Sequence, residues 1–255
     1  MTNLQAPAAL VTGGAIRLGK HIALALAAQG YDIALHYNSS VQAAEETADL
    51  IRQLGRRCEC FSCNLGEVQA IPDLIKQAKF IFPNLNVLVN SASAYTQARI
   101  SETTLEVFDA QFAINIRAPF FLSQSFAYEV KSGNIINIID NKIGFNQFQY
   151  AAYLLAKKTL VEFTRMAALE FAPHIRVNGV APGVVLPAST RSEEYIEWRK
   201  QSIPLKMQGT PDNITKAIIS LLDNDFMSGQ ILVVDGAENI AHIGKNAGDF
   251  DPSKI

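Results

Sequence analysis

The amino-acid sequence predicts an α/β fold in which helices cover both faces of a parallel sheet of about seven strands. Two observations lead to this prediction. Seven short apolar segments alternate along the 255 residues with longer segments whose apolar residues recur at a helical period. The apolar segments are nearly continuous rather than alternately apolar and polar, which is typical of strands that are buried on both faces.

The predicted elements follow one another as repeated β-α-β units. Strands are predicted at residues 8–14, 31–37, 58–65, 85–93, 134–140, 174–183 and 229–236. Helices are predicted between them at residues 15–30, 40–55, 70–82, 106–130 and 150–172. Right-handed crossovers would join these strands into one doubly wound, Rossmann-like sheet. No linker, change of composition or repeat divides the chain, so we expect a single domain over residues 1–255.

Two segments depart from this alternation. Residues 184–210 form a long polar insert between the last two predicted strands, and such inserts are commonly lids or substrate loops. Residues 241–255 form a polar, glycine-containing tail. We expect this tail either to be frayed or to pack on a neighbouring subunit.

The composition disfavours several classes of partner. Basic residues number 22 and acidic residues 24, and the net charge of −2 gives no reason to expect nucleic acid or an anionic membrane as partner. The first residues lack the basic region and long apolar stretch of a secretory signal, and no run is long enough to cross a bilayer. We therefore expect a soluble, cytoplasmic protein. The 49% of apolar residues is enough for a sizeable core.

The three cysteines lie close together in the third predicted strand. Cys58, Cys60 and Cys63 have the spacing C-x-C-x-x-C, which raises the hypothesis of a metal site. In a strand, however, Cys63 would face away from the other two, and no fourth ligand lies beside them. We therefore expect buried thiols and no metal.

A glycine-rich turn, "TGGAIRLG" at residues 12–19, joins the first predicted strand to the first helix. This is the context of a dinucleotide-binding site, where N–H groups at the helix start hold a pyrophosphate. Gly13 would permit the tight turn, and Gly19 would let the helix approach the sheet. Arg17 stands where many such turns have another glycine, and its guanidinium can reach phosphate or substrate. The alternative is a glycine turn without a ligand and a solvated arginine.

The end of the second predicted strand favours NADP over NAD. An NAD site has an acid there, which binds the ribose hydroxyls. Asp32 lies at the start of that strand, roughly 15 Å from its far end at about 3.3 Å per residue. The far end carries no acid and several hydrogen-bond donors, namely His36, Tyr37, Asn38, Ser39 and Ser40.

Tyr153 and Lys157 are four residues apart on a predicted helix and therefore share a face. An ammonium group close to a phenol lowers the pKa of the phenol, which then serves as a general acid or base near neutral pH. The alternative is an ordinary tyrosine and lysine pair.

Asp140 supports the catalytic interpretation of this pair. It ends the fifth predicted strand, at the carboxyl edge where parallel sheets bind ligands. Two further polar features point to the same edge: Asn115 inside an apolar helical stretch, and "VNSAS" at residues 89–93, which ends the fourth strand. The alternative for Asp140 is a solvated acid that begins an Asp-Asn turn.

Over nearly its whole length the sequence resembles the short-chain dehydrogenase/reductases. The resemblance rests on "TGGAIRLG", "NSAS", Asn115, the Tyr153 and Lys157 pair, "IRVNGVAPG" and "SGQILVVDGA". Within that family the chain is most similar to the pteridine reductases. These share the T-G-x-x-x-R-x-G turn, an H-Y-x-x-S segment (residues 36–40 here) and an aspartate, here Asp140, where most relatives have serine.

The resemblance implies catalytic roles for four residues. Tyr153 would donate the proton, and Lys157 would bind the nicotinamide ribose and tune Tyr153. Asn115 would hold a water molecule that links Lys157 to solvent. Asp140, with Tyr153 and water, would supply or relay the proton that a C=N bond needs at nitrogen, whereas a serine would suit a ketone oxygen.

The resemblance also implies binding residues. Arg17 and Ser93 would contact both cofactor and pterin, the pterin would stack on Tyr95, and Trp198 is a candidate wall of the pocket or a core or subunit contact. The full set expected at the cofactor comprises Gly13, Arg17, Leu18, Gly19, His36, Tyr37, Asn38, Ser39, Ser40, Asn64, Leu65, Asn90, Ser91, Ala92, Ser93, Lys157, Pro182 and Gly183. Three of these depart from the family pattern: Ser91 replaces an asparagine, Asn64 an aspartate, and Ser39 a residue that is basic in some pteridine reductases.

The resulting expectation is NADPH-dependent reduction of a C=N bond in a dihydropterin or dihydrofolate. One alternative is a carbonyl reductase of the same family, which acts on a 3-oxoacyl or sugar ketone. Another is a cofactor-binding protein without catalysis. Relatives are commonly tetramers built through the helices that carry Asn115 and Tyr153, and these stretches are apolar on more than one face, so we expect a homotetramer.

Overall fold

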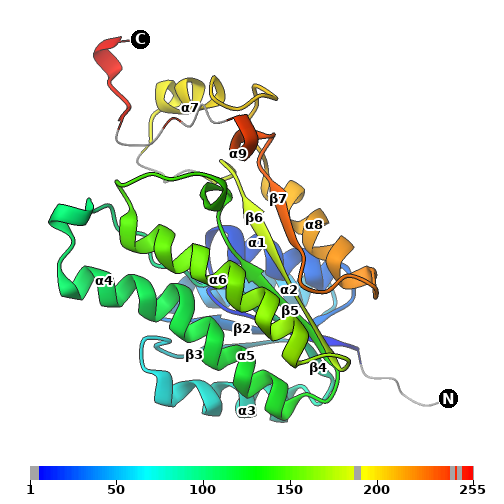
Figure 1. Cartoon of the computed structure of the whole chain (residues 1–255). Helices are drawn as coiled ribbons and strands as arrows, with labels where there is room; N and C mark the ends of the chain where they lie inside the picture. Colours follow the sequence, from blue (N-terminus) through cyan, green and yellow to red (C-terminus); the bar gives the residue numbers. More distant parts are fainter. Residues whose placement is uncertain (1–5, 187–190, 242–244, 246–248, 255) are drawn as a thin grey trace.

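A computed structural model describes residues 6–186, 191–241, 245 and 249–254, and it confirms the predicted fold class. The strands pair in parallel, in the order β3-β2-β1-β4-β5-β6-β7 (Figure 1). Their bounds are β1 Ala8–Val11, β2 Asp32–Tyr37, β3 Cys58–Ser62, β4 Leu85–Asn90, β5 Gly133–Ile138, β6 Ile175–Pro182 and β7 Ile231–Val234. The chain order reverses between β1 and β4, so the connections that leave these strands diverge and open a crevice at their carboxyl ends.

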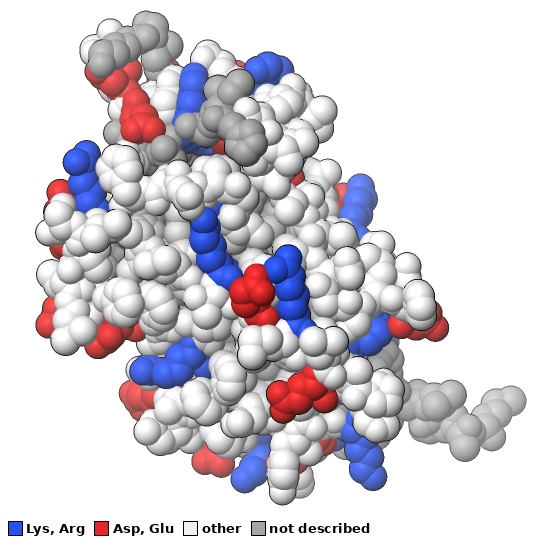
Figure 2. Space-filling view, viewed as in Figure 1, with Lys and Arg blue, Asp and Glu red and all other residues white. Residues whose placement is uncertain are grey.

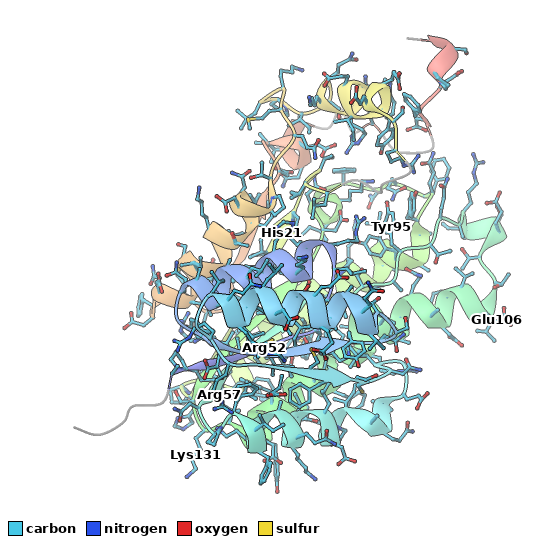
Figure 3. All side chains as sticks on the ribbon, turned by 180° about the vertical axis from the view of Figure 1, so that it is seen from behind. His21, Arg52, Arg57, Tyr95, Glu106 and Lys131 are labelled. Carbon is cyan, nitrogen blue, oxygen red and sulfur yellow. The ribbon has the colours of Figure 1, made fainter. Side chains whose placement is uncertain are left out.

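Helices cover both faces of the sheet. Their bounds are α1 Arg17–Ala28, α2 Val41–Gln53, α3 Ile71–Ile81, α4 Leu105–Phe112, α5 Ala118–Glu129, α6 Ala151–Glu170, α7 Glu193–Lys200, α8 Pro211–Asp223 and α9 Glu238–Ala241. One layer contains α1, α2 and α8, and the other contains α3, α5 and α6. Figure 1 looks onto the side of α4, α5 and α6, and Figure 3 shows α1 and α2 in front when the molecule is seen from behind.

The continuous apolar segments of the sequence follow from this arrangement. Successive side chains of a strand point to opposite faces, and both faces are covered. In β1, Ala9 and Val11 pack in the layer of α1, α2 and α8, whereas Ala8 and Leu10 pack in the layer of α3, α5 and α6. Both sets of positions in such a strand therefore favour apolar residues.

Two predicted segments differ in the structure. The predicted helix at 106–130 is divided into α4 and α5 by a wider π-helical turn, Ala113–Arg117. The predicted polar insert at 184–210 is not all loop, because it contains α7, which begins at a Ser192 cap. Residues 187–190 of this insert lie outside the described residues.

The C-terminal tail was predicted to be frayed or to pack on a neighbouring subunit, and its described part packs on its own chain. Asp249 Oδ1 accepts a hydrogen bond from Gln149 Nε2 at 3.0 Å. The Phe250 ring lies edge-on to the rings of Tyr195 and Trp198, with centroids 5.3 and 5.5 Å away. Residues 242–244, 246–248 and 255 of the tail lie outside the described residues.

Charge is distributed without a strong bias over the face in view. Figure 2 shows positive and negative side chains scattered among large uncharged areas.

Within the described part of the chain, none of the helices combines the length and apolar character that crossing a membrane requires. The cytoplasmic location stays a prediction.

The cysteines are free thiols at the edge strand of the sheet. Cys58 is buried, and Cys60 and Cys63 are half-buried. Burial raises the pKa of Cys58 to about 12 and that of Cys60 to about 11, so both are neutral at physiological pH. Over the described residues, His, Cys, Asp and Glu side chains do not gather into a group that could hold a metal ion.

Candidate active site

A cavity of about 630 Å³ opens at the carboxyl ends of the central strands, where the chain order reverses. It brings together most of the residues that the sequence singled out. Those in its lining are Gly13, Arg17, Leu18, Gly19, His36, Tyr37, Asn38, Ser39, Ser40, Asn64, Leu65, Ser91, Ala92, Ser93, Tyr95, Asp140, Tyr153, Lys157, Pro182 and Gly183. Three predicted residues, Asn90, Asn115 and Trp198, are outside the lining.

The glycine turn has the backbone that a phosphate cradle requires. Gly13 has a φ of +63°, and a Cβ atom there would lie 3.0 Å from Ala92 Cα. A Cβ atom on Gly19 would lie 2.0 Å from the Gly13 carbonyl oxygen, so helix α1 approaches the turn as closely as predicted. The first turn of α1 has neither an acidic residue nor a side-chain cap, which suits its N–H groups to an anion.

Thr12 ties this turn to the end of β4. Its hydroxyl accepts hydrogen bonds from the N–H groups of Ser91 and Ala92, at 2.9 and 3.1 Å, and donates to the Val89 carbonyl. The two loops that border the crevice are therefore joined by one buried side chain. This role of Thr12 was not predicted from the sequence, where the available signal is a threonine directly before the glycines.

The residues at the carboxyl end of β2 and just beyond it differ in their surroundings. His36 is buried, and its Nδ1 accepts from the Gly13 N–H at 3.1 Å, so Nε2 carries the proton and donates to the Cys63 carbonyl at 2.9 Å. Burial lowers the pKa of His36, which keeps the ring neutral. The prediction of His36 as a donor for a 2′-phosphate is thus wrong, because both ring nitrogens are occupied. Asn38 and Ser39 are exposed beyond it.

Asp32 has a structural role at the opposite end of β2. Its carboxylate accepts a hydrogen bond from the Arg57 N–H at 3.0 Å and lies 3.6 Å from Arg56 Nε. It is the first residue of the strand, as the sequence indicated, and the cavity lies at the other end.

Asp140, Tyr153 and Lys157 all line the cavity. Tyr153 Oη donates to Asp140 Oδ2 at 2.9 Å, and the Lys142 N–H donates to Asp140 Oδ1 at 2.8 Å. Lys157 Nζ donates to the carbonyl of Ile138, the last residue of β5, at 2.8 Å. One helix and one strand end therefore place a phenol, an ammonium group and a carboxylate side by side.

Burial determines the electrostatics of this group. It raises the pKa of Tyr153 well above 10, and the adjacent Asp140 carboxylate adds to the increase. It lowers the pKa of Lys157 to about 8, which Asp140 partly offsets. Lys157 Nζ lies 5.8 Å from the centroid of the Tyr153 ring and donates to the Ile138 carbonyl, and the tuning of Tyr153 by Lys157 stays a prediction. Tyr153 is accordingly a phenol with a proton to give.

Asn115 supports the wall of the cavity from behind. It is fully buried in the π-helical turn, where its Oδ1 accepts from Ser93 Oγ at 2.8 Å. Its Nδ2 donates to the carbonyls of Ala94 and Gln111, at 2.8 and 3.0 Å. These bonds fix the loop that follows β4. The water-holding role of Asn115 stays a prediction.

Aromatic rings form the outer part of the site. Tyr95 stacks on Tyr150, with centroids 4.3 Å apart and planes 11° apart, and it meets the Tyr153 ring edge-on at 4.7 Å. Figure 3 labels Tyr95 at the upper end of the main body, below α7. Tyr95 remains 52% exposed, so part of its ring is accessible to a ligand. The stacking partner, Tyr150, was not predicted from the sequence.

Two predicted residues have other surroundings. Trp198 belongs to α7 and packs against Tyr195 and Phe250. Asn90 is buried in the sheet, where its Nδ2 donates to Asn137 Oδ1 at 2.8 Å. Asn90 thus connects β4 to β5 instead of facing the cavity.

Comparisons with known proteins agree with this arrangement. A family model described as enoyl-(acyl carrier protein) reductase matches residues 14–237. An uncharacterized oxidoreductase of Mycobacterium tuberculosis is 31% identical over 252 residues, with 92% of this chain and 93% of the relative covered. The 2-dehydro-3-deoxy-D-gluconate 5-dehydrogenase of Escherichia coli is 29% identical over 245 residues, covering 92% of this chain and 96% of the relative.

A solved structure with the same fold is FolM alternative dihydrofolate reductase 1 from Brucella suis in complex with NADP. It superimposes with a TM-score of 0.88 at 28% identity and covers 95% of this chain and 98% of the other. The family match, the sheet order and the grouping of tyrosine, lysine and carboxylate lead to one assignment. The chain belongs to the short-chain dehydrogenase/reductase family and is an NAD(P)-dependent oxidoreductase.

Proposed function

We propose that this oxidoreductase uses NADPH to reduce a C=N bond of a dihydropterin or dihydrofolate. The single observation that carries this proposal is the 2.9 Å hydrogen bond from Tyr153 to Asp140. It joins the proton-donating phenol of the site to a carboxylate, in a position where most relatives have serine. The similarity to a structure named as an alternative dihydrofolate reductase supports the same substrate class.

The chemistry of a C=N bond fits this pair of side chains. When bound, NADPH supplies a hydride, which adds to the carbon while the π electrons move to nitrogen. The nitrogen then takes a proton, and Tyr153 holds one because its pKa is raised well above 10. Asp140 is half-buried and links Tyr153 to solvent, so the phenolate regains its proton through the carboxyl group.

Asp140 also suits the ring of a pterin. The 2-amino-4-oxo ring presents N–H donors, and an ionised carboxylate accepts hydrogen bonds without donating any. A ketone offers an oxygen acceptor instead, which a carboxylate would repel and a serine hydroxyl would bind. The same residue therefore disfavours a ketone and favours an imine.

The cofactor assignment to NADPH rests on the end of β2. Residues 37–40 line the cavity and include no acid, so nothing there repels a 2′-phosphate. Asn38 and Ser39 are exposed and offer hydrogen-bond donors. The Brucella suis structure with NADP supports this preference.

A carbonyl reductase is the second candidate function. The Escherichia coli relative, a 2-dehydro-3-deoxy-D-gluconate 5-dehydrogenase by name, favours this alternative. A panel that includes small ketones decides between the two.

We also propose that the protein is a homotetramer. Helices α5 and α6 keep large apolar side chains exposed on their outer surface: Phe120 (43%), Tyr128 (87%), Met166 (67%) and Leu169 (82%). Exposed apolar groups gathered on neighbouring helices are typical of an interface between subunits.

Replacing Asp140 tests the substrate proposal. We expect Asp140→Ser to lower kcat for dihydrobiopterin and dihydrofolate by about 100-fold, because the substrate nitrogen loses its proton relay. Turnover of small ketones should rise or stay unchanged. The measurement is NADPH oxidation at 340 nm, with Tyr153→Phe as the control that removes activity on both classes. Unchanged pterin turnover in Asp140→Ser would contradict the proposal.

The lowered pKa of Lys157 predicts that activity falls at alkaline pH. As pH rises through about 8, Lys157 loses its proton and the site loses a cation that binds the cofactor. The value of kcat/KM for NADPH should then fall about tenfold per pH unit. In Lys157→Met, kcat/KM for NADPH should be low at every pH. Lys158→Met, at the next position of α6, should keep the wild-type pH profile. A flat wild-type profile from pH 7 to 9.5 would refute the assignment.

Ser39 tests the cofactor preference. A carboxylate in Ser39→Asp would repel the 2′-phosphate, so KM for NADPH should rise about tenfold or more while KM for NADH changes little. Steady-state kinetics with both cofactors provide the comparison. An equal change in KM for NADPH and for NADH would show that the end of β2 does not contact the 2′-phosphate.

Light scattering tests the oligomer. We expect a mass of four times the 27.9 kDa chain. Leu169→Glu should lower it, because a charge would enter the interface, whereas Phe80→Glu, at an equally exposed site on α3, should not. A wild-type mass near that of one chain would rule out the tetramer.

A further inference from the structure

A buried ion pair holds α7 against the segment that follows β7. Arg199 and Glu238 lie 2.7 Å apart, and their side chains are only 4% and 1% exposed. Two charges removed from water this completely are stable only as partners. The pair therefore fixes the position of α7, which belongs to the insert that was predicted to cover the substrate.

The same glutamate contacts the residue next to Asp140. Asn141 Nδ2 donates to Glu238 Oε2 at 3.0 Å and to Asp235 Oδ2 at 3.1 Å. Because both partners are carboxylates, the nitrogen of the amide must face them, so the orientation of Asn141 is determined. Asp235 is itself held by the N–H groups of Ala237 and Asn239, at 2.9 and 2.7 Å.

Asn141 thereby anchors the turn that carries the carboxylate of Asp140. Asp140 caps the short helical turn Asn141–Gly144 by accepting the Lys142 N–H, and its second oxygen is left for Tyr153. The far end of this turn is also tightly packed, because a Cβ atom on Gly144 would lie 3.0 Å from Asn239 Cβ.

The three segments in this chain of contacts are distant in the sequence and meet at one end of the sheet. Arg199 lies on α7, Glu238 on α9 and Asn141 in the turn after β5. Figure 1 shows α7 and α9 near each other, above the end of β6. A displacement of α7 would therefore reach Asp140 through two buried polar contacts.

We propose that Asn141 is a positioning residue for the carboxylate of Asp140, and that the Arg199 and Glu238 pair couples α7 to it. This inference rests on the catalytic role proposed for Asp140. The alternative is a purely structural network, which would stabilise the fold without affecting the geometry of the carboxylate.

A double-mutant cycle separates these two cases. Asn141→Ala should lower kcat about tenfold, because a carboxylate displaced by a fraction of an ångström relays a proton poorly. The Kd of NADPH should stay within twofold. In an Asp140→Ala background the same substitution should cost less than about twofold, since the group that it positions is absent. Equal losses in both backgrounds would overturn the proposal. If Asn141→Ala does not fold, Asn141→Ser, which keeps a shorter donor, takes its place in the cycle.

Fluorescence quenching of Trp198 tests the coupling between α7 and Asp140 separately. Trp198, the only tryptophan of the chain, directly precedes Arg199 and reports on the packing of α7. Arg199→Gln should increase acrylamide quenching of Trp198 and lower kcat as Asn141→Ala does. Lys200→Gln, which removes an exposed pair with Glu197 on the same helix, should change neither. Wild-type quenching or wild-type kcat in Arg199→Gln would overturn the coupling.

Failure of the proposed function gives a different result. Wild-type protein that reduces ketones and no dihydropterin would contradict the pterin assignment. The cycle is then run with the ketone, where additive losses still overturn the positioning role and non-additive losses support it. The quenching of Trp198 needs no substrate and is measured in either case.

Discussion

The site depends on a constraint imposed by the parallel sheet. Because helices cover both faces, the strands are mostly apolar along their length, and polar groups that contact ligands lie at the strand ends. Two buried polar side chains of the central strands are hydrogen-bonded inside the fold: Asn90 donates to Asn137, and Asn137 donates to Thr164 on α6. The reversal of strand order between β1 and β4 then selects one end, since only there do the connections diverge and leave a crevice.

Burial is also the main cause of the pKa shifts of Tyr153 and Lys157, the proposed catalytic pair. Proximity between Tyr153 and Lys157 on α6 suggests an electrostatic effect of the lysine on the phenol. The desolvation of both groups is larger, and it drives the pKa of Tyr153 up and that of Lys157 down. Asp140 adds to the first change and opposes the second. A neutral phenol that is hydrogen-bonded to a carboxylate is suited to giving a proton, and a lysine with a pKa of about 8 remains mostly charged at neutral pH.

The sequence predicts those features that depend on local pattern. The seven strands, the turn at Gly13 and Gly19, and the meeting of Asp140 with Tyr153 follow from periodicity, chain order and the rule that parallel strands end at one edge. Contacts between distant segments leave no such pattern. Thr12 bonding to the loop after β4, His36 turned inward to Gly13, and Asn141 between Asp235 and Glu238 each depend on the backbone of another element. For the same reason the sequence left Trp198 open as a pocket wall or a core or subunit contact, because nothing in its own helix indicates that Phe250 packs on it.

The arrangement around Asp140 costs the fold stability, and this cost supports the proposed catalytic role of its groups. Tyr153 and Lys157 are 6% and 3% exposed, and a buried lysine whose pKa has fallen from 10.5 to about 8 has lost favourable hydration. Apolar residues of similar size at these positions would remove that cost. A protein that only bound a cofactor would gain stability from such replacements. The chain instead keeps a phenol, an ammonium group and a carboxylate together, and perturbed groups of this kind cluster at sites of chemistry.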